Sequence, residues 1–569
     1  MNNLENNEKQ NTKRIQFKPK YFIASACFAL CFTFFLVVGG VIYDRDLFPN
    51  LQLLKESGNV FKLSPFLFLI MTGVTYVLFL ILDGKTVPEF TFLPKWICNA
   101  FVPAGIFAVW FGIVYLSFFP GTWCYDIIEQ NRMVLGIVDV TKQHPPLHTL
   151  IWAMCHLVET VSNGRLPAIV IYSILQIICM ALVLGRVVYS VRKVSRNDIL
   201  MILAFLFFLL NPTFALFSFS PTKDVWCMFF FVLAAMHVFE WIFERGEMTK
   251  IGSIRTDNKT DGKEKKAIRR VWETEKNAWE TDAETLARIA LDLLLACLFR
   301  NNTVYGLILF GIILLFAFRN YRRETVLFGA IVLVAFLVID KGIFGFIGFA
   351  EPDMKEMLSV PIQQIGRVYI DHGDEITAEE SSQIDRYIGL ENAPYYSPHI
   401  SDPLKKNFNT EAVKSDPVDF LTFYLSLGGK YPDSYLIAYA SLYSPYWYVR
   451  SKSFDVYSVS PYVETFITKD PDYSFERKGY LPALNEAYEK AADSSENPLL
   501  SRGIPLWITL FTLFVALALR KKRAVVIPLM CLCYMLTLFL GPLAIIRYAL
   551  PVLAAVPFMI CGVLVRNKA

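Results

Sequence analysis

Charged residues are scarce in this chain of 569 residues, of which 19% are Asp, Glu, Lys or Arg and 54% are hydrophobic. The mean hydropathy of +0.41 lies above the range of soluble globular proteins of this size. The formal net charge of +4 is too small to indicate a nucleic-acid partner. The sequence therefore predicts a protein whose main solvent is the lipid bilayer, with no nucleic acid among its partners.

Cysteine is missing from the long polar segment 350–503, although the chain has 11 cysteines in all. Most of them fall inside or at the edge of apolar segments, so a disulfide framework is not expected. Cys531 and Cys533 have the spacing of a CxC metal motif, but their apolar surroundings favour core packing.

The N-terminus lacks a small-residue cleavage site, although its basic first twenty residues resemble the start of a signal peptide. The apolar run from Tyr21 to Tyr43 is also long for a signal-peptide core. We expect residues 1–20 to be cytoplasmic and this run to be an uncleaved membrane helix.

Twelve apolar runs approach the roughly 20 residues that a membrane helix needs. They lie near 21–43, 64–84, 96–118, 166–190, 198–219, 222–243, 284–299, 303–319, 324–343, 504–520, 524–543 and 545–566. The fold class is therefore predicted to be mainly α, a polytopic protein of the cell membrane with about 12 transmembrane helices. Basic loops favour the cytoplasmic side, which places both termini there.

The apolar segment 146–162 is predicted not to cross the membrane. If it crossed, the basic stretch Arg192-Lys193-Arg196 and the Lys/Arg-rich loop 244–283 would both move outside, against the positive-inside rule. We expect it to lie along the outer interface within an outer loop, 119–165.

The remaining organisation follows from this topology. Residues 21–343 form a transmembrane region with a cytoplasmic loop at 244–283, residues 344–503 form an extracytoplasmic domain, and residues 504–569 form the C-terminal membrane helices. Aromatic clusters such as 443–448 fit a packed core better than a sugar-binding face.

Asp126 is the leading catalytic candidate. It follows Pro120-Gly121, which end the preceding helix, and a carboxylate at the membrane surface can be partly desolvated for acid–base work. The alternative is that Asp126 caps the helix that follows it.

A rigid approach to the interfacial helix is predicted at Pro145-Pro146, which places Lys142 and His144 where they could hold a phosphate. His148 follows His144 by one helical turn. With Asp126, the two histidines could instead bind a metal, although their spacing is weak evidence. We expect no cofactor, and the sequence leaves open whether a divalent metal ion binds.

Further charged residues lie in short outer turns of the apolar chain. Placing Lys223-Asp224 there costs free energy unless the two residues pair with opposite charges or serve a function. Arg300 and Arg547 run against the positive-inside bias, so each needs a local anion such as a lipid phosphate or an internal carboxylate.

These residues resemble the GT-C superfamily of integral-membrane glycosyltransferases, such as protein O-mannosyltransferases and aminoarabinose lipid A transferases. The resemblance lies in Asp126, the stretch His144-Pro145-Pro146-Leu147, Arg165-Leu166-Pro167 and the second outer acid Asp224. The pattern is closer still to uncharacterised bacterial membrane proteins of that superfamily, in which Phe-Pro-Gly, Thr-Lys-Asp, the stretch 361–367 and Arg-Tyr-Ala-Leu-Pro recur.

The resemblance implies transfer of a sugar from a polyprenyl-phosphate donor to a cell-surface acceptor, with inversion at the anomeric carbon. Asp126 would act as general base, and Asp224 would orient a cation or the acceptor. The expected phosphate ligands are Lys142, His144, Lys223, Arg300 and Arg547. The expected acceptor or loop-positioning residues are Glu129, Gln130, His148, Asn301, Gln363, Gln364, Arg367 and Tyr548.

The chain departs from that superfamily in two respects. Two spans precede the helix that leads to Asp126, and the loop has no adjacent pair of acids, which puts a metal-dependent mechanism in doubt. Two other function classes remain open. A transporter or flippase of lipid-linked saccharide would show charged or broken helices at mid-membrane depth, and a non-catalytic partner would bind envelope glycan through 344–503.

Overall fold

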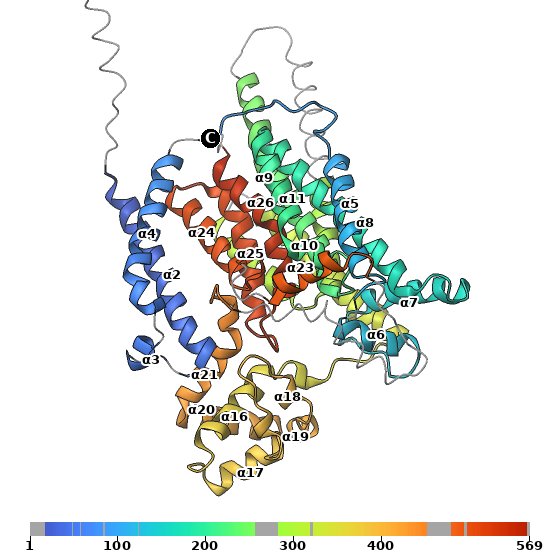
Figure 1. Ribbon diagram of the computed structural model, residues 1–569, viewed down its shortest axis with the longest axis vertical. Coiled ribbons are helices and arrows are strands. Elements are labelled where there is room, and N and C mark those ends of the chain that lie inside the picture. Colours follow the sequence, from blue (N-terminus) through green and yellow to red (C-terminus); the bar gives the residue numbers. More distant parts are fainter. Residues whose placement is uncertain are drawn as a thin grey trace, which may run out of the picture.

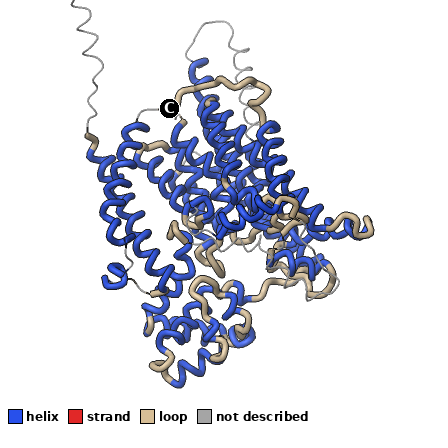
Figure 2. The backbone as a smooth tube through the Cα atoms, viewed as in Figure 1, coloured by secondary structure: helices blue, strands red, loops and turns tan. Residues whose placement is uncertain are grey.

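The computed structural model describes residues 17–47, 49, 51–56, 59–83, 86–122, 124–256, 283–318, 322–451, 479–493 and 498–565. Within these residues the structure is helical, with isolated β-bridges as the sole extended pairings (Figure 2). The mainly α prediction is confirmed.

Each predicted apolar run contains a helix (Figure 1). The helices are α2 (Pro19–Arg45), α4 (Asn59–Leu82), α5 (Phe101–Ser117), α8 (Ala168–Ser195), α9 (Asp198–Leu210), α11 (Lys223–Thr256), one over 283–299, α13 (Thr303–Ala317), α14 (Arg322–Leu337), α24 (Ile504–Ala518), α25 (Val526–Leu538) and α26 (Leu550–Leu564). Among the described residues, six helices are long and apolar enough to cross a membrane. The chain is therefore a helical, membrane-associated protein.

The structure adds detail at two of the predicted apolar runs. Helix α11 continues past the run 222–243 to Thr256, into the segment predicted as a cytoplasmic loop, while residues 257–282 of that loop lie outside the described residues. The run 198–219 breaks at Asn211, where α10 (Pro212–Phe217) begins. Pro212 has no backbone N–H, and the Asn211 side chain accepts a hydrogen bond from Thr213 N at 3.0 Å, so a new helix starts here.

Basic segments gather at one end of the helix bundle, which we call the basic end. Lys18 binds Asp83 there, Phe90 N donates to Arg196 O, and Lys521 Nζ donates to Val563 O. The last turn of α26 also lies at this end, and Figure 1 shows the helices α16 to α20 at the opposite end. We call the opposite end the α6 end, after α6 (Tyr125–Val134).

Helix α7 (Pro146–Val161) stays at the α6 end and projects sideways from the bundle (Figure 1). Its inner face buries Trp152 and Cys155, whereas Met154 and Val161 on the outer face are 69% and 77% exposed. The chain then turns at 162–167 directly into α8. This path of the chain is consistent with the predicted interfacial helix. The basic segments lie at the basic end, away from α7.

The predicted domain 344–503 divides into parts. Its first residues form α15 (Phe344–Ile347), which continues directly from α14 and η2 (Val338–Ile343). A helical domain follows, with a core that includes Ile362, Ile384 and Phe420. Its helices are α16 (Ser359–His372), α17 (Ala378–Tyr387), α18 (Asp402–Lys405), α19 (Thr410–Ser415), α20 (Pro417–Lys430) and α21 (Pro432–Tyr443).

The chain after α21 returns to the bundle. Tyr443 and Tyr446 are fully buried, which confirms the core interpretation of the aromatic cluster. Further along, α23 (Pro482–Asp493) covers the end of α5, where Asn485 Nδ2 donates to Ser117 O at 3.0 Å. Cys531 and Cys533 are buried free thiols, as expected for core packing.

Candidate functional site

The chain enters the site through a tight turn between α5 and α6. Phe119-Pro120 is a cis peptide, and Gly121 has φ +142°. A Cβ at Gly121 would lie 2.9 Å from Ile169 Cγ1 of α8, so only glycine fits this close approach. Two side-chain contacts then fix this turn to the loop before α11: Thr122 Oγ1 lies 3.2 Å from Ser220 Oγ, and Cys124 Sγ donates to Pro221 O at 2.7 Å.

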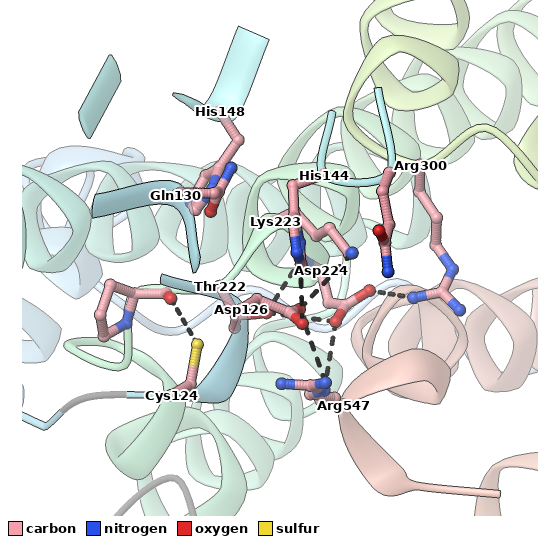
Figure 3. A network of polar contacts seen from close by, with 12 residues as sticks. Cys124, Asp126, Gln130, His144, His148, Thr222, Lys223, Asp224, Arg300 and Arg547 are labelled. Carbon is pink, nitrogen blue, oxygen red and sulfur yellow. Dashed lines mark hydrogen bonds and ion pairs between the residues drawn. The ribbon is translucent and has the colours of Figure 1, made fainter. Parts of the chain in front are cut away.

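Asp126 lies in the first turn of α6 but does not cap it. Cys124 is the N-cap residue, and it makes no side-chain capping bond. The Asp126 carboxylate instead faces Lys223 Nζ at 3.5 Å, Arg547 Nη2 at 3.5 Å and His144 Nδ1 at 3.9 Å. The capping alternative is therefore wrong, and Asp126 belongs to a charged cluster (Figure 3).

Asp224 joins two arginines in the same cluster. Its Oδ1 pairs with Arg300 Nη1, its Oδ2 lies 3.4 Å from Arg547 Nε, and Thr222 Oγ1 donates to Oδ2 at 3.1 Å. The Arg300 guanidinium also lies 3.8 Å above the ring of Tyr548, a cation–π contact. Asp224 and Tyr548 thus hold both arginines in place.

Polar atoms in this cluster are buried without direct partners. Asp126 Oδ2, His144 Nδ1 and Arg300 Nε hydrogen-bond to none of the described residues. The ion-pair distances around Asp126, 3.5 to 3.9 Å, exceed those of direct hydrogen bonds. Because such buried atoms are costly unless they are bonded, the cluster is suited to water or to the oxygens of a ligand.

The charges in the cluster set the protonation states of Asp126 and His144. Burial raises the pKa of Asp126, but the Lys223 and Arg547 cations lower it more, so the carboxyl stays well below its usual range. Burial and Lys223 lower the pKa of His144 to about 4 against the opposing effect of Asp126. Near neutral pH the site therefore holds an ionised Asp126 beside a neutral His144.

His148 lies apart from this cluster, in a buried chain of hydrogen bonds. Its Nδ1 donates to Gln130 Oε1 at 2.7 Å, since an amide oxygen only accepts, and its Nε2 lies 2.7 Å from Tyr172 OH. Tyr172 OH also accepts from Trp226 Nε1 at 2.6 Å. This chain joins α6, α7, α8 and α11, and it fixes α6 one turn after Asp126.

The proposed metal site of Asp126, His144 and His148 is therefore not formed. Both ring nitrogens of His148 are bonded elsewhere, so His148 cannot share a ligand with His144. Among the described residues there is also no group of three or more His, Cys, Asp or Glu side chains placed to hold a metal ion.

Lys142 pairs with the segment that leads into the helical domain. Its Nζ donates to Glu351 Oε1 at 2.7 Å and lies 3.9 Å from Asp340 Oδ2. Its backbone N donates to Ala350 O at 2.8 Å. Lys142 therefore anchors the loop that carries His144 and is not among the cations around Asp126.

The predicted stretch 361–367 contacts the helical domain and the end of α2. Gln363 donates to Ser397 O and Gln364 Nε2 donates to Tyr435 O, both within the helical domain. Arg367 pairs with Asp371 and with Asp46, which follows α2. These predicted acceptor-positioning residues hold the domain together and tie it to α2.

Two other predicted residues are neighbours of the cluster along the chain. Glu129 is half-buried and pairs with Arg132 on α6 at 3.0 Å. Asn301 lies in the turn before α13, next to Arg300. Tyr172 and Trp226 were missed, because a tyrosine and a tryptophan inside apolar helices carry no signal of a polar role in the sequence.

Comparisons with known proteins give a family for this chain. No curated protein and no solved structure matches it. A family model matches residues 136–569, a range that includes His144, Lys223, Asp224, Arg300 and Arg547 and begins after Asp126. Since the match covers well over half of the chain, the protein belongs to the family described as a family of unknown function (DUF6020).

Proposed function

We propose that this protein is a membrane glycosyltransferase that moves a sugar from a polyprenyl-phosphate donor to an acceptor hydroxyl at the outer face of the cell membrane. The observation that carries the proposal is the charged cluster at the α6 end. Lys223, Arg300 and Arg547 face two carboxylates, Asp126 and Asp224, which leaves one positive charge in excess among these five.

A buried excess of positive charge favours an anion, and the form of the cations favours a phosphate. Two are arginines, whose guanidinium groups match phosphate oxygens in geometry. The third, Lys223, begins α11, where the helix N-terminus adds a positive dipole. Arg300 Nε, which is buried and bonded to no described residue, can donate to a ligand oxygen.

The proposed topology brings a lipid-linked donor to this cluster. All twelve helical runs would cross the bilayer, with the basic end and both termini in the cytoplasm and the helical domain outside. The exposed apolar face of α7, with Met154 and Val161, would rest in the outer interface. A polyprenyl chain in the bilayer could then place its phosphate at the α6 end.

The chemistry is a single displacement. The acceptor oxygen would attack the anomeric carbon as its bond to the phosphate oxygen breaks, and the acceptor proton would pass to the Asp126–His144 pair. Lys223, Arg300 and Arg547 would stabilise the charge that develops on the departing lipid phosphate. One displacement inverts the configuration at the anomeric carbon.

Purified protein in proteoliposomes tests this proposal. Radiolabelled sugars on polyprenyl phosphate would be supplied with a cell-envelope acceptor fraction, and transfer of label to the acceptor is expected. Label that crosses the bilayer while it stays on the lipid would instead support the flippase alternative. Label that neither transfers nor crosses, with the donor shown to be intact, would contradict both.

One observation favours the transporter as the second candidate. His237 on α11 and Asp292 on the helix over 283–299 form a pair at 2.8 Å within the bundle. Ionisable pairs inside membrane spans occur in transport pathways. Replacement of Asp292 by Asn should leave sugar transfer near the wild-type rate if the pair serves helix packing alone, whereas abolished lipid translocation would favour the transporter.

A further inference from the structure

We propose that His144 accepts the proton of the acceptor hydroxyl, and that Asp126 orients the imidazole for this step. The inference rests on the proposed glycosyl transfer and concerns the same site. It divides between two side chains a role that the sequence assigns to Asp126 alone.

The two oxygens of Asp126 have different neighbours. Oδ2 lies 3.5 Å from both Lys223 Nζ and Arg547 Nη2, while Oδ1 faces His144 Nδ1 at 3.9 Å. A carboxylate that two cations hold ionised is a weak base, so it is poorly suited to take a proton from a hydroxyl. It is well suited to receive an imidazole N–H and to stabilise the imidazolium that forms.

The nearby carboxylate of Asp126 favours one tautomer of His144. With the N–H on Nδ1 directed to Asp126 Oδ1, the lone pair lies on Nε2, where it can accept a proton. In Figure 3 the His144 ring points toward Asp126 from the side opposite Arg547. The two atoms are 3.9 Å apart, and catalytic hydrogen bonds that are long in a free enzyme often tighten when substrate binds.

His144 is held by fixed backbone on both sides. Two residues earlier, Lys142 N donates to Ala350 O and the Lys142 side chain binds Glu351. The next residue is Pro145, the N-cap of α7, followed by Pro146 at the first helical position. A rigid mount of this kind suits a group that must meet a reacting atom.

The surrounding charges couple proton acceptance to donor binding. The charged groups that act on His144 are Lys223 from α11, Arg547 from the start of α26 and Asp126 from α6, and the two cations make the imidazole less basic in the empty site. A bound phosphate would offset the cations and restore that basicity. The acceptor hydroxyl would therefore be activated only when the donor is present.

One proton and one sugar change places in this step. The acceptor O–H bond breaks as its oxygen bonds to the anomeric carbon, and the proton moves to Nε2 of His144. The bond from the anomeric carbon to the phosphate oxygen breaks, and its electron pair leaves with the lipid phosphate. The imidazolium then returns its proton to water or to the departing phosphate.

The test is the pH dependence of sugar transfer in proteoliposomes for the wild type, His144→Gln and His156→Gln. In the wild type, the acid limb of kcat should lie at higher pH than the acid limb of kcat/KM. The first reports the pKa of His144 in the donor complex, and the second reports it in the free protein. His144→Gln should lower kcat by about 100-fold or more, keep the donor KM within about 3-fold and lose the acid limb. His156 pairs with Glu159 on α7 at 3.2 Å, and His156→Gln is the matched control, which should leave kcat, the donor KM and the acid limb unchanged.

Two results would overturn the inference alone. One is a His144→Gln variant that transfers sugar at the wild-type rate and shows the same acid limb. The other, which needs no variant, is a wild-type kcat limb at or below that of kcat/KM. Failure of the wild type to transfer sugar from any polyprenyl-phosphate donor would instead overturn the proposed function, and this inference with it.

Discussion

Arg547 lies between the two candidate carboxylates, with Nη2 3.5 Å from Asp126 Oδ2 and Nε 3.4 Å from Asp224 Oδ2. It joins the first turn of α6 to the start of α11 from the far end of the chain. Because its side chain is only 12% exposed, water screens these pairs weakly. One guanidinium thus contacts both carboxylates, alongside Lys223 at Asp126 and Arg300 at Asp224.

Arg547→Lys tests that bridge. An ammonium keeps the charge but cannot meet both carboxylates with separate nitrogens. We expect the donor KM to rise and kcat/KM for transfer to fall about 10-fold to 100-fold, which is the cost of about 1.4 to 2.8 kcal/mol of binding. Arg132→Lys, on the exposed face of α6, is the control, and equal effects of the two variants would contradict the bridging role.

Gly121→Ala tests the turn that leads to Asp126. The residue has φ +142°, and the new Cβ would meet Ile169 at 2.9 Å. We expect the free energy of unfolding to fall by about 1–3 kcal/mol, seen as a lower melting temperature in detergent. Gly112→Ala in α5, where a Cβ meets nothing within 4 Å, should not be destabilised. Equal melting temperatures for the two variants would show that the turn tolerates a side chain.

His148 should make stability depend on pH. Burial and Lys223 lower the pKa of His148 to about 3, below the usual value near 6.5 that applies to the unfolded chain. As the pH falls below 6.5 the unfolded state takes up a proton first, so the stability that neutral His148 contributes is full above pH 6.5 and is lost toward pH 3. At pH 5 the loss is about 2 kcal/mol.

His148→Gln removes this contribution, so the decline in melting temperature between pH 7.5 and pH 5 should be smaller than in the wild type. His144, whose pKa is about 4, leaves part of the decline in place. A variant that matches the wild-type decline would show that His148 can charge freely in the folded protein.

Arg367→Met tests whether the stretch 361–367 is structural. Arg367 is buried and pairs with Asp46 and Asp371, so its loss leaves two carboxylates without this partner. We expect a loss of about 3–5 kcal/mol in the free energy of unfolding. Arg386→Met, which removes an exposed pair with Asp419, should cost less than about 1 kcal/mol. A stable Arg367→Met protein with impaired acceptor use would restore the acceptor-positioning interpretation.

Much of the charged cluster could be predicted from the sequence. Charged residues are conspicuous in an apolar chain, and the distribution of basic loops assigns Asp126, Lys223, Arg300 and Arg547 to one end of the bundle. The same reasoning placed α7 beside them, because a crossing helix there would have moved basic loops to the wrong side.

The partners of individual residues could not be predicted. Lys142 lies near His144 in sequence, but Glu351 pairs with it from a distant segment. His148 and Gln130 are bonded within a buried chain that ends at Tyr172 and Trp226, whose positions in apolar helices look ordinary. Such pairings depend on which helix faces touch, and periodicity along one chain does not determine that.

Asp126→Asn tests the central claim most directly, since the substitution removes the charge that faces Lys223, Arg547 and His144 while it keeps the shape of the side chain. The measurement is transfer of radiolabelled sugar from polyprenyl phosphate in proteoliposomes, with the melting temperature of each protein as the control for folding. The predicted result is a folded variant whose transfer rate falls by about 1,000-fold or more. Transfer by a folded Asp126→Asn protein at near the wild-type rate would contradict the account.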